Sequence, residues 1–146
     1  MKQDTTLTAH PSGLPTEQIA ELRKLAAAAA ERSYSPYSKF RVGAALMLED
    51  GSIYTGCNIE NASYRLTICA ENSAIANAIN KAGPKIYVRA IAVANLNNAA
   101  SMPCGACRQI LLEFGGPSTW IFGPGENGLV DVSLGDLLPF AFHLAT

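Results

Sequence analysis

Two stretches of this chain are apolar on both of their alternating faces, and they limit its fold more than any other feature. Residues 41–48 read RVGAALML and residues 88–94 read VRAIAVA. A strand with apolar side chains on both faces belongs inside a sheet that other elements cover on both sides. A chain of 146 residues is long enough to build one such domain with a substantial core. We therefore expect a single sheet between helices.

Turn and helix signals divide the rest of the chain into further elements. Gly83-Pro84 and Gly115-Gly116-Pro117 mark the ends of two helices, and Asp50-Gly51 marks a hairpin turn. The pattern predicts helices over about 15–32, 69–80 and 104–114, a last helical turn after Ser133, and strands over 41–48, 53–57, 88–94, 119–122 and 129–132. This order predicts an α/β fold, a three-layer α/β/α sandwich with a five-stranded mixed sheet. We expect residues 1–13 to form a flexible tail and residues 14–146 to form a single domain.

Charge and hydropathy exclude several classes of partner. The chain has 11 Lys and Arg against 12 Asp and Glu, a formal net charge of −1, whereas proteins that bind polyanions carry a basic excess. We therefore expect no nucleic-acid partner and no membrane partner. The polar N-terminus lacks a signal-peptide core, and no run approaches the roughly 18 apolar residues of a membrane span. The expected location is cytoplasmic, where four cysteines favour metal binding or catalysis over disulfides.

Three of the four cysteines stand where two predicted helices begin. Cys69 opens one helix, and Cys104 and Cys107 open another. Cys104 and Cys107 are three residues apart, so both sulfurs can face one ion from the first helical turn. A helix N-terminus also stabilises a thiolate. These patterns predict a Zn²⁺ site with three protein ligands and an open fourth position, which is typical of catalytic zinc, whereas Cys57 as a fourth ligand would make the site structural.

Glu71 follows Cys69 by two residues and can project over the open side of the ion. An acidic residue in a first helical turn is also favoured by the helix dipole alone. Glu71 therefore indicates a catalytic role only because it lies beside a predicted zinc site. There, a carboxylate above a zinc-activated water is the general base that hydrolysis requires. A metal ligand, one residue, Glu and then a distant Pro-Cys-x-x-Cys is the signature of zinc deaminases. We therefore identify Glu71 as the catalytic candidate.

Longer segments around these motifs resemble the small, homotetrameric, three-cysteine zinc class of cytidine deaminases. The resemblance covers roughly residues 14–142 and is carried by four segments: SPYSKFRVGAA at 35–45, GCNIENASY at 56–64, ICAE at 68–71 and PCGACRQ at 103–109. The second segment discriminates this class, because many deaminases share the zinc motif. The resemblance implies a cytidine deaminase-like fold, a Zn²⁺ cofactor, a nucleoside substrate and a homotetramer whose active sites are shared between subunits.

The resemblance also implies roles for residues outside the zinc motif. In this family the residues matching Asn58 and Glu60 hold the ribose hydroxyls, and the residue matching Phe40 packs on the pyrimidine. Three further matching residues contribute across subunit contacts: Ala62, Tyr64 and Phe142. The implied reaction is hydrolytic deamination of cytidine and 2′-deoxycytidine to uridine and 2′-deoxyuridine plus ammonia, a step of pyrimidine salvage.

In the expected mechanism, Glu71 takes a proton from water beside the zinc and passes it to N3 of the pyrimidine, which makes C4 open to attack by hydroxide. Glu71 then relays a proton to the leaving amine, while the backbone amides of Ala70 and Cys104 stabilise the developing charge. One position departs from the family pattern. Asn72 stands where family members usually have an arginine that offsets the thiolate charge. Arg108, next to Cys107, is then expected to offset part of that charge.

Three other functions stay open at this point. A deaminase of an N4-modified cytidine or another aminopyrimidine nucleoside would use the same zinc motif. Cys104-Gly-Ala-Cys107 alone would fit a thiol oxidoreductase, and four cysteine ligands would fit a non-catalytic zinc module. Residues 123–128, GPGENG, match the dinucleotide-binding pattern GxGxxG, but a strand is predicted to follow, so we expect a hairpin loop. His10, in the tail, and His143 are expected to be surface residues.

Overall fold

The computed structural model describes residues 9–146, so most of the expected tail lies outside the described residues. Residues 9–146 contain four α-helices, none of them long and apolar enough to cross a membrane, and five strands. The helices are α1 (Thr16–Ala30), α2 (Ala70–Ala82), α3 (Gly105–Phe114) and α4 (Leu134–Leu137). The strands are β1 (Val42–Leu48), β2 (Ile53–Cys57), β3 (Val88–Asn95), β4 (Trp120–Gly125) and β5 (Gly128–Ser133). All the predicted elements are present, and their ends differ from the predicted ones by a few residues.

The strands form one mixed sheet in the order β2-β1-β3-β4-β5. β1 pairs antiparallel with both β2 and β3, β3 pairs parallel with β4, and β5 pairs antiparallel with β4. β1 and β3, the two strands predicted to be covered on both faces, both lie inside the sheet. The predicted five-stranded mixed sheet is confirmed.

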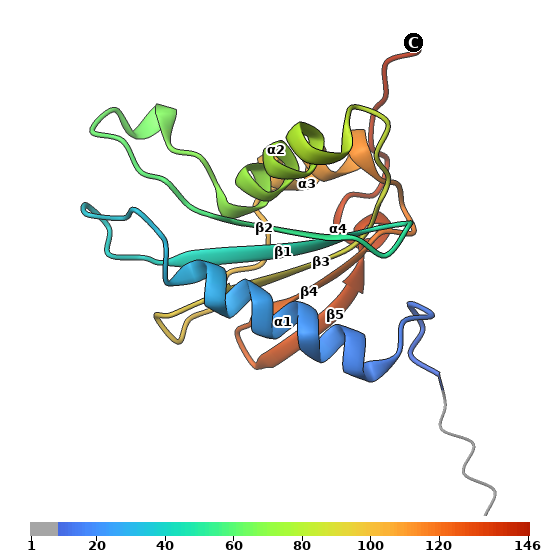
Figure 1. The fold of residues 1–146 in the computed structure, drawn as a ribbon, viewed down its shortest axis with the longest axis horizontal. Coiled ribbons are helices and arrows are strands. Elements are labelled where there is room, and N and C mark those ends of the chain that lie inside the picture. The colour runs from blue at the N-terminus through green and yellow to red at the C-terminus, as the bar shows by residue number, and fades with distance from the viewer. Residues whose placement is uncertain (1–8) are drawn as a thin grey trace, which may run out of the picture.

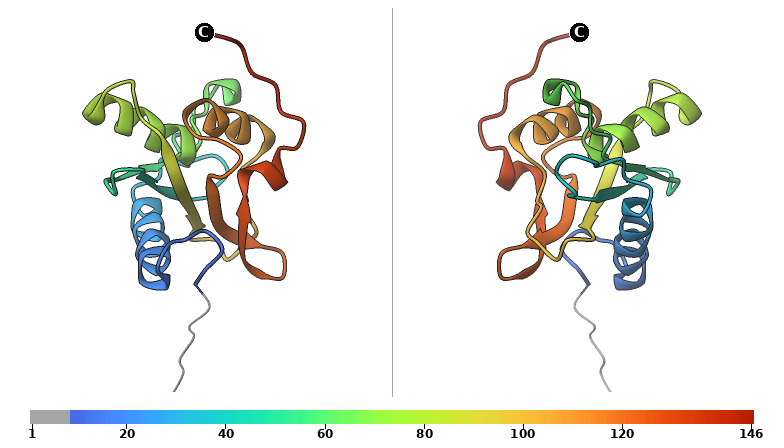
Figure 2. Two further views of the ribbon diagram at one scale, coloured as in Figure 1. Left: turned by 90° about the vertical axis from the view of Figure 1, so that its right-hand side faces the viewer. Right: turned by 90° about the vertical axis from the view of Figure 1, so that its left-hand side faces the viewer.

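Helices cover both faces of this sheet (Figure 1, Figure 2). α1 covers one face, where its side chains pack against Ala45, Met47, Ala90, Ala92 and Phe122. α2 and α3 cover the other face, where they pack against Ala44, Leu46, Leu48, Ile91 and Ile121. Residues of β1 alternate between the two cores because successive side chains of a strand point to opposite faces. The three-layer arrangement predicted from the apolar strands is therefore present.

The topology brings three segments that are distant in sequence to one edge of the sheet, the edge at which β2 and β3 end and β1 begins. β2 and β3 both run antiparallel to β1, so β2 and β3 point in the same direction. α2 follows the end of β2, and α3 follows the end of β3. β1 begins at the same edge, because Val42 pairs with Asn95 at the end of β3. The starts of α2, α3 and β1 therefore lie together.

Gly56 lets α2 lie directly on the backbone of the edge strand β2. A Cβ atom at position 56 would lie 2.3 Å from the backbone nitrogen of Ala74 in α2, which is closer than real side chains approach. The amide of Asn77 adds a hydrogen bond from its Nδ2 to the carbonyl oxygen of Thr55 at 3.2 Å. The position of α2, and with it the position of its first turn, is therefore set by close contact with the sheet.

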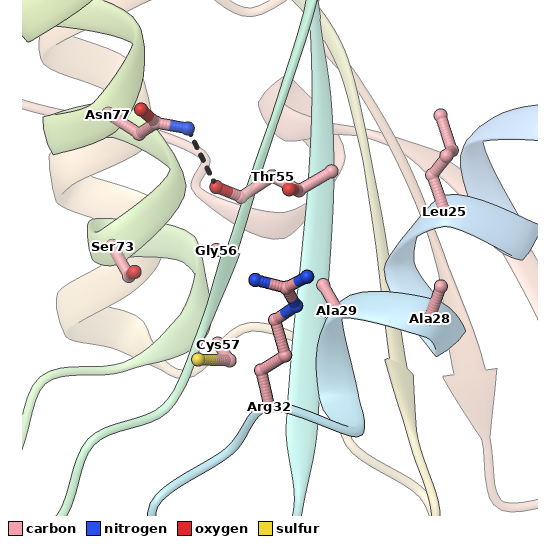
Figure 3. A pocket seen from close by; sticks show the side chains of 9 residues that line it. All are labelled: Leu25, Ala28, Ala29, Arg32, Thr55, Gly56, Cys57, Ser73 and Asn77. Atoms are coloured by element: carbon pink, nitrogen blue, oxygen red, sulfur yellow. Dashed lines mark hydrogen bonds between the residues drawn. The ribbon is translucent and has the colours of Figure 1, made fainter.

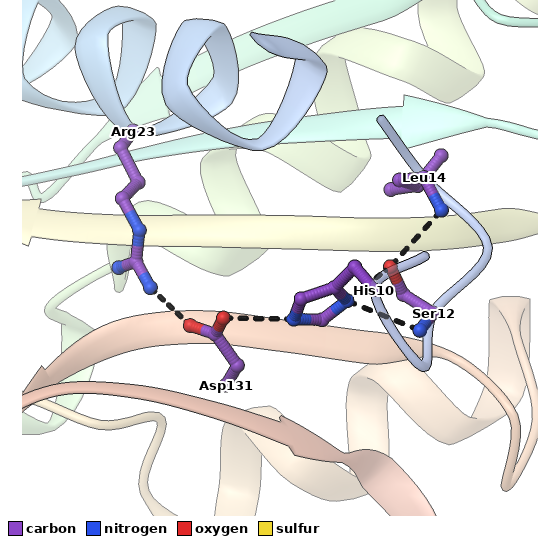
Figure 4. A network of polar contacts seen from close by, with 5 residues as sticks. All are labelled: His10, Ser12, Leu14, Arg23 and Asp131. Carbon is purple, nitrogen blue, oxygen red and sulfur yellow. Dashed lines mark hydrogen bonds and ion pairs between the residues drawn. The ribbon is translucent and has the colours of Figure 1, made fainter. Parts of the chain in front are cut away.

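The segment before α1 is fixed to β5 through His10 (Figure 4). Nε2 of His10 lies 2.9 Å from Oδ2 of Asp131, Nδ1 lies 2.7 Å from Oγ of Ser12, and the ring packs edge-on against Trp120. Arg23 of α1 also donates to Asp131. His10 therefore lies at the surface as predicted, but it is held by specific contacts, and its interpretation as part of a loose segment is wrong. Its partner Asp131 lies 121 residues away, so no local pattern could reveal the contact.

The glycine-rich segment 123–128 forms the tip of a β-hairpin, in agreement with the predicted hairpin. Gly125, the last residue of β4, pairs with Gly128, the first residue of β5, and residues 126–127 form the turn between them. The residues that follow continue as β5, so no helix N-terminus stands where a dinucleotide pyrophosphate would bind. The glycines that match GxGxxG therefore belong to a hairpin turn and not to a dinucleotide-binding loop.

Candidate metal centre and active site

Three sulfur atoms converge where α2 and α3 begin. Cys69 is the N-cap residue of α2, Cys104 is the N-cap residue of α3, and Cys107 follows in the first turn of α3. Their Sγ atoms all lie within 4.8 Å of one another. Cys107 is buried and Cys69 half-buried, whereas Cys104 is exposed. The structure thus assembles the three cysteines that the spacing predicted, with one side of the group open.

This donor set fits zinc. A tetrahedral Zn²⁺ with Zn–S bonds of about 2.3 Å holds its sulfur ligands about 3.8 Å apart, a spacing compatible with sulfurs that all lie within 4.8 Å of one another. Thiolates are soft ligands that favour zinc over Mg²⁺ or Ca²⁺, and two helix N-termini offset their negative charge. The chain therefore has a zinc-binding site made of Cys69, Cys104 and Cys107, in which three ligands leave a fourth position free for chemistry.

Glu71 lies beside the sulfur atoms and is almost completely buried. The residue is 5% exposed, and Sγ of Cys107 donates to its Oε2 at 3.5 Å. Burial raises the pKa of the Glu71 carboxyl above its ordinary value. A raised pKa makes the carboxylate a stronger base, so Glu71 accepts a proton more readily than an exposed glutamate does. The geometry and the electrostatics together suit Glu71 to proton transfer.

The thiols of the site differ in acidity. Interaction with the neighbouring Cys107 thiol stabilises the thiolate of Cys69 and lowers the pKa of Cys69 to about 7. The same interaction, together with burial, raises the pKa of Cys107 above its ordinary value. One thiolate is therefore available near neutral pH, and the binding of zinc must release the remaining protons.

A cavity of about 190 Å³ lies over these residues. Six predicted site residues line it: Asn58, Cys69, Ala70, Glu71, Cys104 and Cys107. Sequence reasoning missed four others: Val42, Thr67, Ser101 and Met102. Ser101 and Met102 directly precede the Pro-Cys-x-x-Cys motif, a signal that could have identified them. The cavity is smaller than the roughly 300–1,000 Å³ common for ligand sites, so a ligand of nucleoside size needs further walls.

The other predicted site residues do not line this cavity: Phe40, Glu60, Ala62, Tyr64 and Phe142. We call Cys69, Glu71, Cys104 and Cys107 the floor of the site. Three segments near the same edge of the sheet, residues 37–41, 58–60 and 95–101, carry or contact Phe40, Asn58 and Glu60, and we call them its rim.

Asn58 ties the end of β2 to the start of β1. Its Oδ1 accepts hydrogen bonds from the backbone N–H of Val42 at 3.0 Å and from the hydroxyl of Ser33. Its Nδ2 donates to the carbonyl oxygen of Phe40 at 2.8 Å. A carboxamide has two N–H donors, so Asn58 keeps one for a ligand in the cavity that it lines.

The carboxylate of Glu60 is held by the segment that precedes Phe40. Oε1 accepts from the backbone N–H groups of Tyr37 and Ser38 at 2.9 and 3.1 Å, and Oε2 accepts from the hydroxyl of Ser38 at 2.5 Å. The hydrogen bond from that hydroxyl holds the pKa of Glu60 below its ordinary value. Glu60 is therefore a fixed, ionised acceptor at neutral pH.

Three predicted residues are exposed in this single chain: Ala62, Tyr64 and Phe142. Tyr64 is 70% exposed and contacts Tyr37 edge-on, with ring centroids 5.9 Å apart. The loop that carries Ala62 and Tyr64 extends away from the sheet, in green in Figure 1. Exposed aromatic side chains of this kind are typical of surfaces that contact another molecule.

Arg108 braces the loop that presents Cys104. Its Nε donates to the carbonyl oxygen of Pro103 at 2.8 Å, and one terminal nitrogen donates to that of Leu137 at 3.1 Å. The guanidinium therefore connects the start of α3 to the end of α4. The sequence predicts that the charge of Arg108 offsets part of the thiolate charge, and this bracing contact adds a structural role.

A larger cavity of about 560 Å³ lies beside the outer edge of β2, between α1 and α2 (Figure 3). Cys57 lines this cavity together with Arg32 and Ser73. Cys57 does not join the group formed by the other three cysteines. The position of Cys57 therefore does not support it as a fourth sulfur ligand, and the metal site has three cysteine ligands.

Comparisons with known proteins agree with this site. A family model described as the cytidine and deoxycytidylate deaminase zinc-binding region matches residues 16–123. The cytidine deaminase of Mycobacterium tuberculosis is 45% identical over 123 residues, which cover 84% of this chain and 88% of that protein. The cytidine deaminase of Sporosarcina psychrophila is 44% identical over 125 residues, which cover 85% of this chain and 88% of that protein.

Solved structures show the same similarity. The crystal structure of cytidine deaminase from Mycobacterium tuberculosis matches with a TM-score of 0.75 and 44% identity, covering 86% of this chain and 98% of that chain. The crystal structure of cytidine deaminase from Burkholderia pseudomallei matches with a TM-score of 0.73 and 41% identity, covering 88% of this chain and all of that chain.

Proposed function

This chain belongs to the cytidine deaminase family, and on that premise we propose how its residues carry out the reaction. The chain is an enzyme that hydrolyses cytidine to uridine and ammonia. The observation that carries this conclusion is the convergence of Cys69, Cys104 and Cys107 beside a buried Glu71 over one cavity. We include 2′-deoxycytidine as a second substrate, because the reacting pyrimidine is the same in both nucleosides.

Cys69, Cys104 and Cys107 would hold the zinc ion of this reaction. When bound, zinc lowers the pKa of an adjacent water molecule so that hydroxide forms near neutral pH. The N-termini of α2 and α3 stabilise the three thiolates. The backbone N–H groups of Ala70 and Cys104 lie at these same helix starts, which supports them as donors to charge that develops on the pyrimidine ring.

Glu71 would move the protons of the reaction. Its carboxylate takes a proton from the attacking water and delivers it to N3 of the pyrimidine, so that C4 becomes electrophilic and accepts the hydroxyl oxygen. Glu71 then takes the proton of the new C4 hydroxyl and passes it to the amino nitrogen, the bond between C4 and that nitrogen breaks as the C4 carbonyl forms, and the nitrogen leaves as ammonia. The burial of Glu71 and its raised pKa support a group that gains and loses a proton within one turnover.

Asn58, Glu60 and Phe40 would hold the nucleoside. The free N–H of Asn58 and the ionised carboxylate of Glu60 supply one donor and one acceptor, the pair that vicinal hydroxyls require. Phe40 would pack on the pyrimidine, since it lies two residues before Val42, which lines the cavity. The carbonyl oxygen of Phe40 is bonded to Asn58, so the groups proposed for the ribose and for the base share one hydrogen-bonded unit.

A second copy of the chain would complete the site, and we propose a homotetramer. The cavity of one chain is small for a nucleoside, while Tyr64 and Phe142 expose most of their surface. Ala62 and Tyr64 would reach a neighbouring site from their extended loop, and Phe142 would do so from the C-terminal segment.

Residues 14–146 would form the single deaminase domain. Four free cysteines, three of them zinc ligands, favour a reducing compartment such as the cytoplasm.

The test is the loss of the cytidine ultraviolet chromophore with purified, zinc-replete protein, with an N4-substituted cytidine measured alongside. Glu71→Gln is expected to keep zinc and fold and to lower turnover by at least about 100-fold, because the amide cannot move a proton. Glu113→Gln, an exposed glutamate of α3, is the matched control and should retain full activity. Wild-type turnover in Glu71→Gln would contradict the role of Glu71. A wild-type enzyme that acts on the N4-substituted nucleoside alone would favour the alternative deaminase.

A further inference from the structure

Asn97, in the loop that follows β3, holds the backbone on both sides of Phe40. Its Nδ2 donates to the carbonyl oxygen of Lys39 at 2.9 Å, and its Oδ1 accepts from the backbone N–H of Arg41 at 2.9 Å. These partners lie 58 and 56 residues away in sequence. A single carboxamide therefore bridges the two residues that flank the aromatic side chain.

The backbone that Asn97 holds is a strained one. Lys39 has a φ of 61°, in the left-handed region that residues other than glycine rarely adopt. Such a conformation persists only where surrounding contacts hold it in place. Phe40 itself is held on both sides, because its N–H donates to Oγ of Ser38 at 3.0 Å and its carbonyl oxygen accepts from Asn58. Asn97 supplies the contacts to the residues just outside Phe40.

The loop that presents Asn97 is itself braced. Oδ1 of Asn95 accepts from the backbone N–H groups of Asn97 and Ala99 at 3.0 and 3.3 Å, and its Nδ2 donates to the carbonyl oxygen of Ala99 and to Oγ of Ser101, each at 2.7 Å. Ser101 lines the cavity above the floor. Asn97 is therefore carried on a fixed loop, one end of which forms a wall of the site.

We propose that Asn97 is a positioning residue for nucleoside binding, which acts by fixing the orientation of Phe40 against the pyrimidine. This inference rests on the proposed function, because it takes Phe40 as the surface on which the base packs. Asn97 does not line the cavity, and its effect on the substrate passes through the backbone of residues 39–41. Loss of the bridge should weaken binding of cytidine while leaving the zinc site and the chemical step intact.

The first experiment compares Asn97→Ala with Asn127→Ala in the full chain. Asn97→Ala is expected to raise KM for cytidine about tenfold, because it removes both hydrogen bonds that hold the residues beside Phe40, with kcat and zinc content unchanged. Asn127→Ala removes an exposed carboxamide from the turn between β4 and β5, outside the floor and the rim, so its KM should equal that of the wild type. Asn97→Asp retains the acceptor for the N–H of Arg41 and should give an intermediate KM.

The second experiment tests whether the effect passes through Phe40. Asn97→Ala is introduced into a Phe40→Ala background, where it should raise KM no further, because the residue it positions is gone. A full tenfold rise in that background would overturn the proposal, as would an unchanged KM in Asn97→Ala alone or a parallel loss of zinc and kcat. If the wild-type chain does not deaminate cytidine, the proposed function fails. If the wild type is active and these variants disagree with expectation, the positioning role of Asn97 alone fails.

Discussion

The floor and the rim of the site are held in place by different kinds of interaction. Each floor residue stands in the first turn of a helix or at its N-cap, and the parallel direction of β2 and β3 brings the two helix starts together. The rim segments are joined by hydrogen bonds between side chains and backbone across 16 to 58 residues of sequence. The comparison suggests that the floor supplies the metal site and the chemistry, while the rim supplies the geometry of substrate binding.

Removing one floor ligand should have the largest effect. Cys104→Ala leaves two sulfur ligands, too few to hold Zn²⁺ against dilution, so we expect the purified variant to contain little zinc and to show no measurable deamination. Zinc content by mass spectrometry and the ultraviolet assay measure the two effects. The fold should persist, because Cys104 is exposed and the core beneath it is apolar.

Cys57→Ala is the matched control for this experiment. It removes a thiol that lines a different cavity and lies outside the three-cysteine group, so zinc content and turnover should equal those of the wild type. Full zinc content in Cys104→Ala would show that the floor is wrongly assigned. Loss of zinc in Cys57→Ala would instead indicate a four-cysteine structural site.

The second-largest effect is expected at the close contact between Gly56 of β2 and α2, the helix whose first turn carries Glu71. Gly56→Ala would place a Cβ atom 2.3 Å from the backbone nitrogen of Ala74, so α2 must move away from β2. We expect the free energy of unfolding to fall by about 1–3 kcal/mol, as for other overpacked contacts, and kcat to fall because α2 carries Glu71. Thermal unfolding and steady-state kinetics provide the two measurements.

Gly51→Ala separates overpacking from the general cost of replacing a glycine. Gly51 has a φ of 88° and no atoms within 4 Å of an added Cβ, so its replacement costs about 1–2 kcal/mol of backbone strain alone. It lies in the turn between β1 and β2, at the opposite edge of the sheet from the site, and should leave kcat unchanged. If both variants lose stability equally and both keep full kcat, the close contact of α2 does not set the position of the floor.

The same difference between floor and rim decides what the sequence could predict. Cys69, Glu71, Cys104 and Cys107 were identified because helix-start signals and ligand spacing are local patterns, and the order of strands and helices was sufficient to expect them in one domain. Asn97 was missed, because a hydrogen bond from one loop to another leaves no periodicity in the sequence. His10 was misjudged for the same reason, since Asp131 gives no local sign of its partner.

The smallest effect is expected at the rim, where Ser38 holds the carboxylate of Glu60. The hydroxyl of Ser38 donates to Oε2 of Glu60 at 2.5 Å and accepts from the N–H of Phe40 at 3.0 Å. Ser38→Ala leaves Glu60 with its two backbone donors, so we expect KM for cytidine to rise about two- to fivefold at pH 7 with kcat unchanged. Steady-state kinetics with both the variant and the wild type would measure this split.

The pH dependence of KM sharpens this last prediction. In the wild type the hydrogen bond from Ser38 lowers the pKa of Glu60, so the charged acceptor persists to lower pH. In Ser38→Ala the pKa returns towards its ordinary value, and the acid-side rise of KM should therefore begin at a higher pH than in the wild type. Ser52→Ala is the matched control, because the hydroxyl of Ser52 lowers the pKa of Asp50 in the same way at the opposite edge of the sheet. If both serine variants change the KM profile equally, the effect is not specific to the rim, and Glu60 does not hold the substrate.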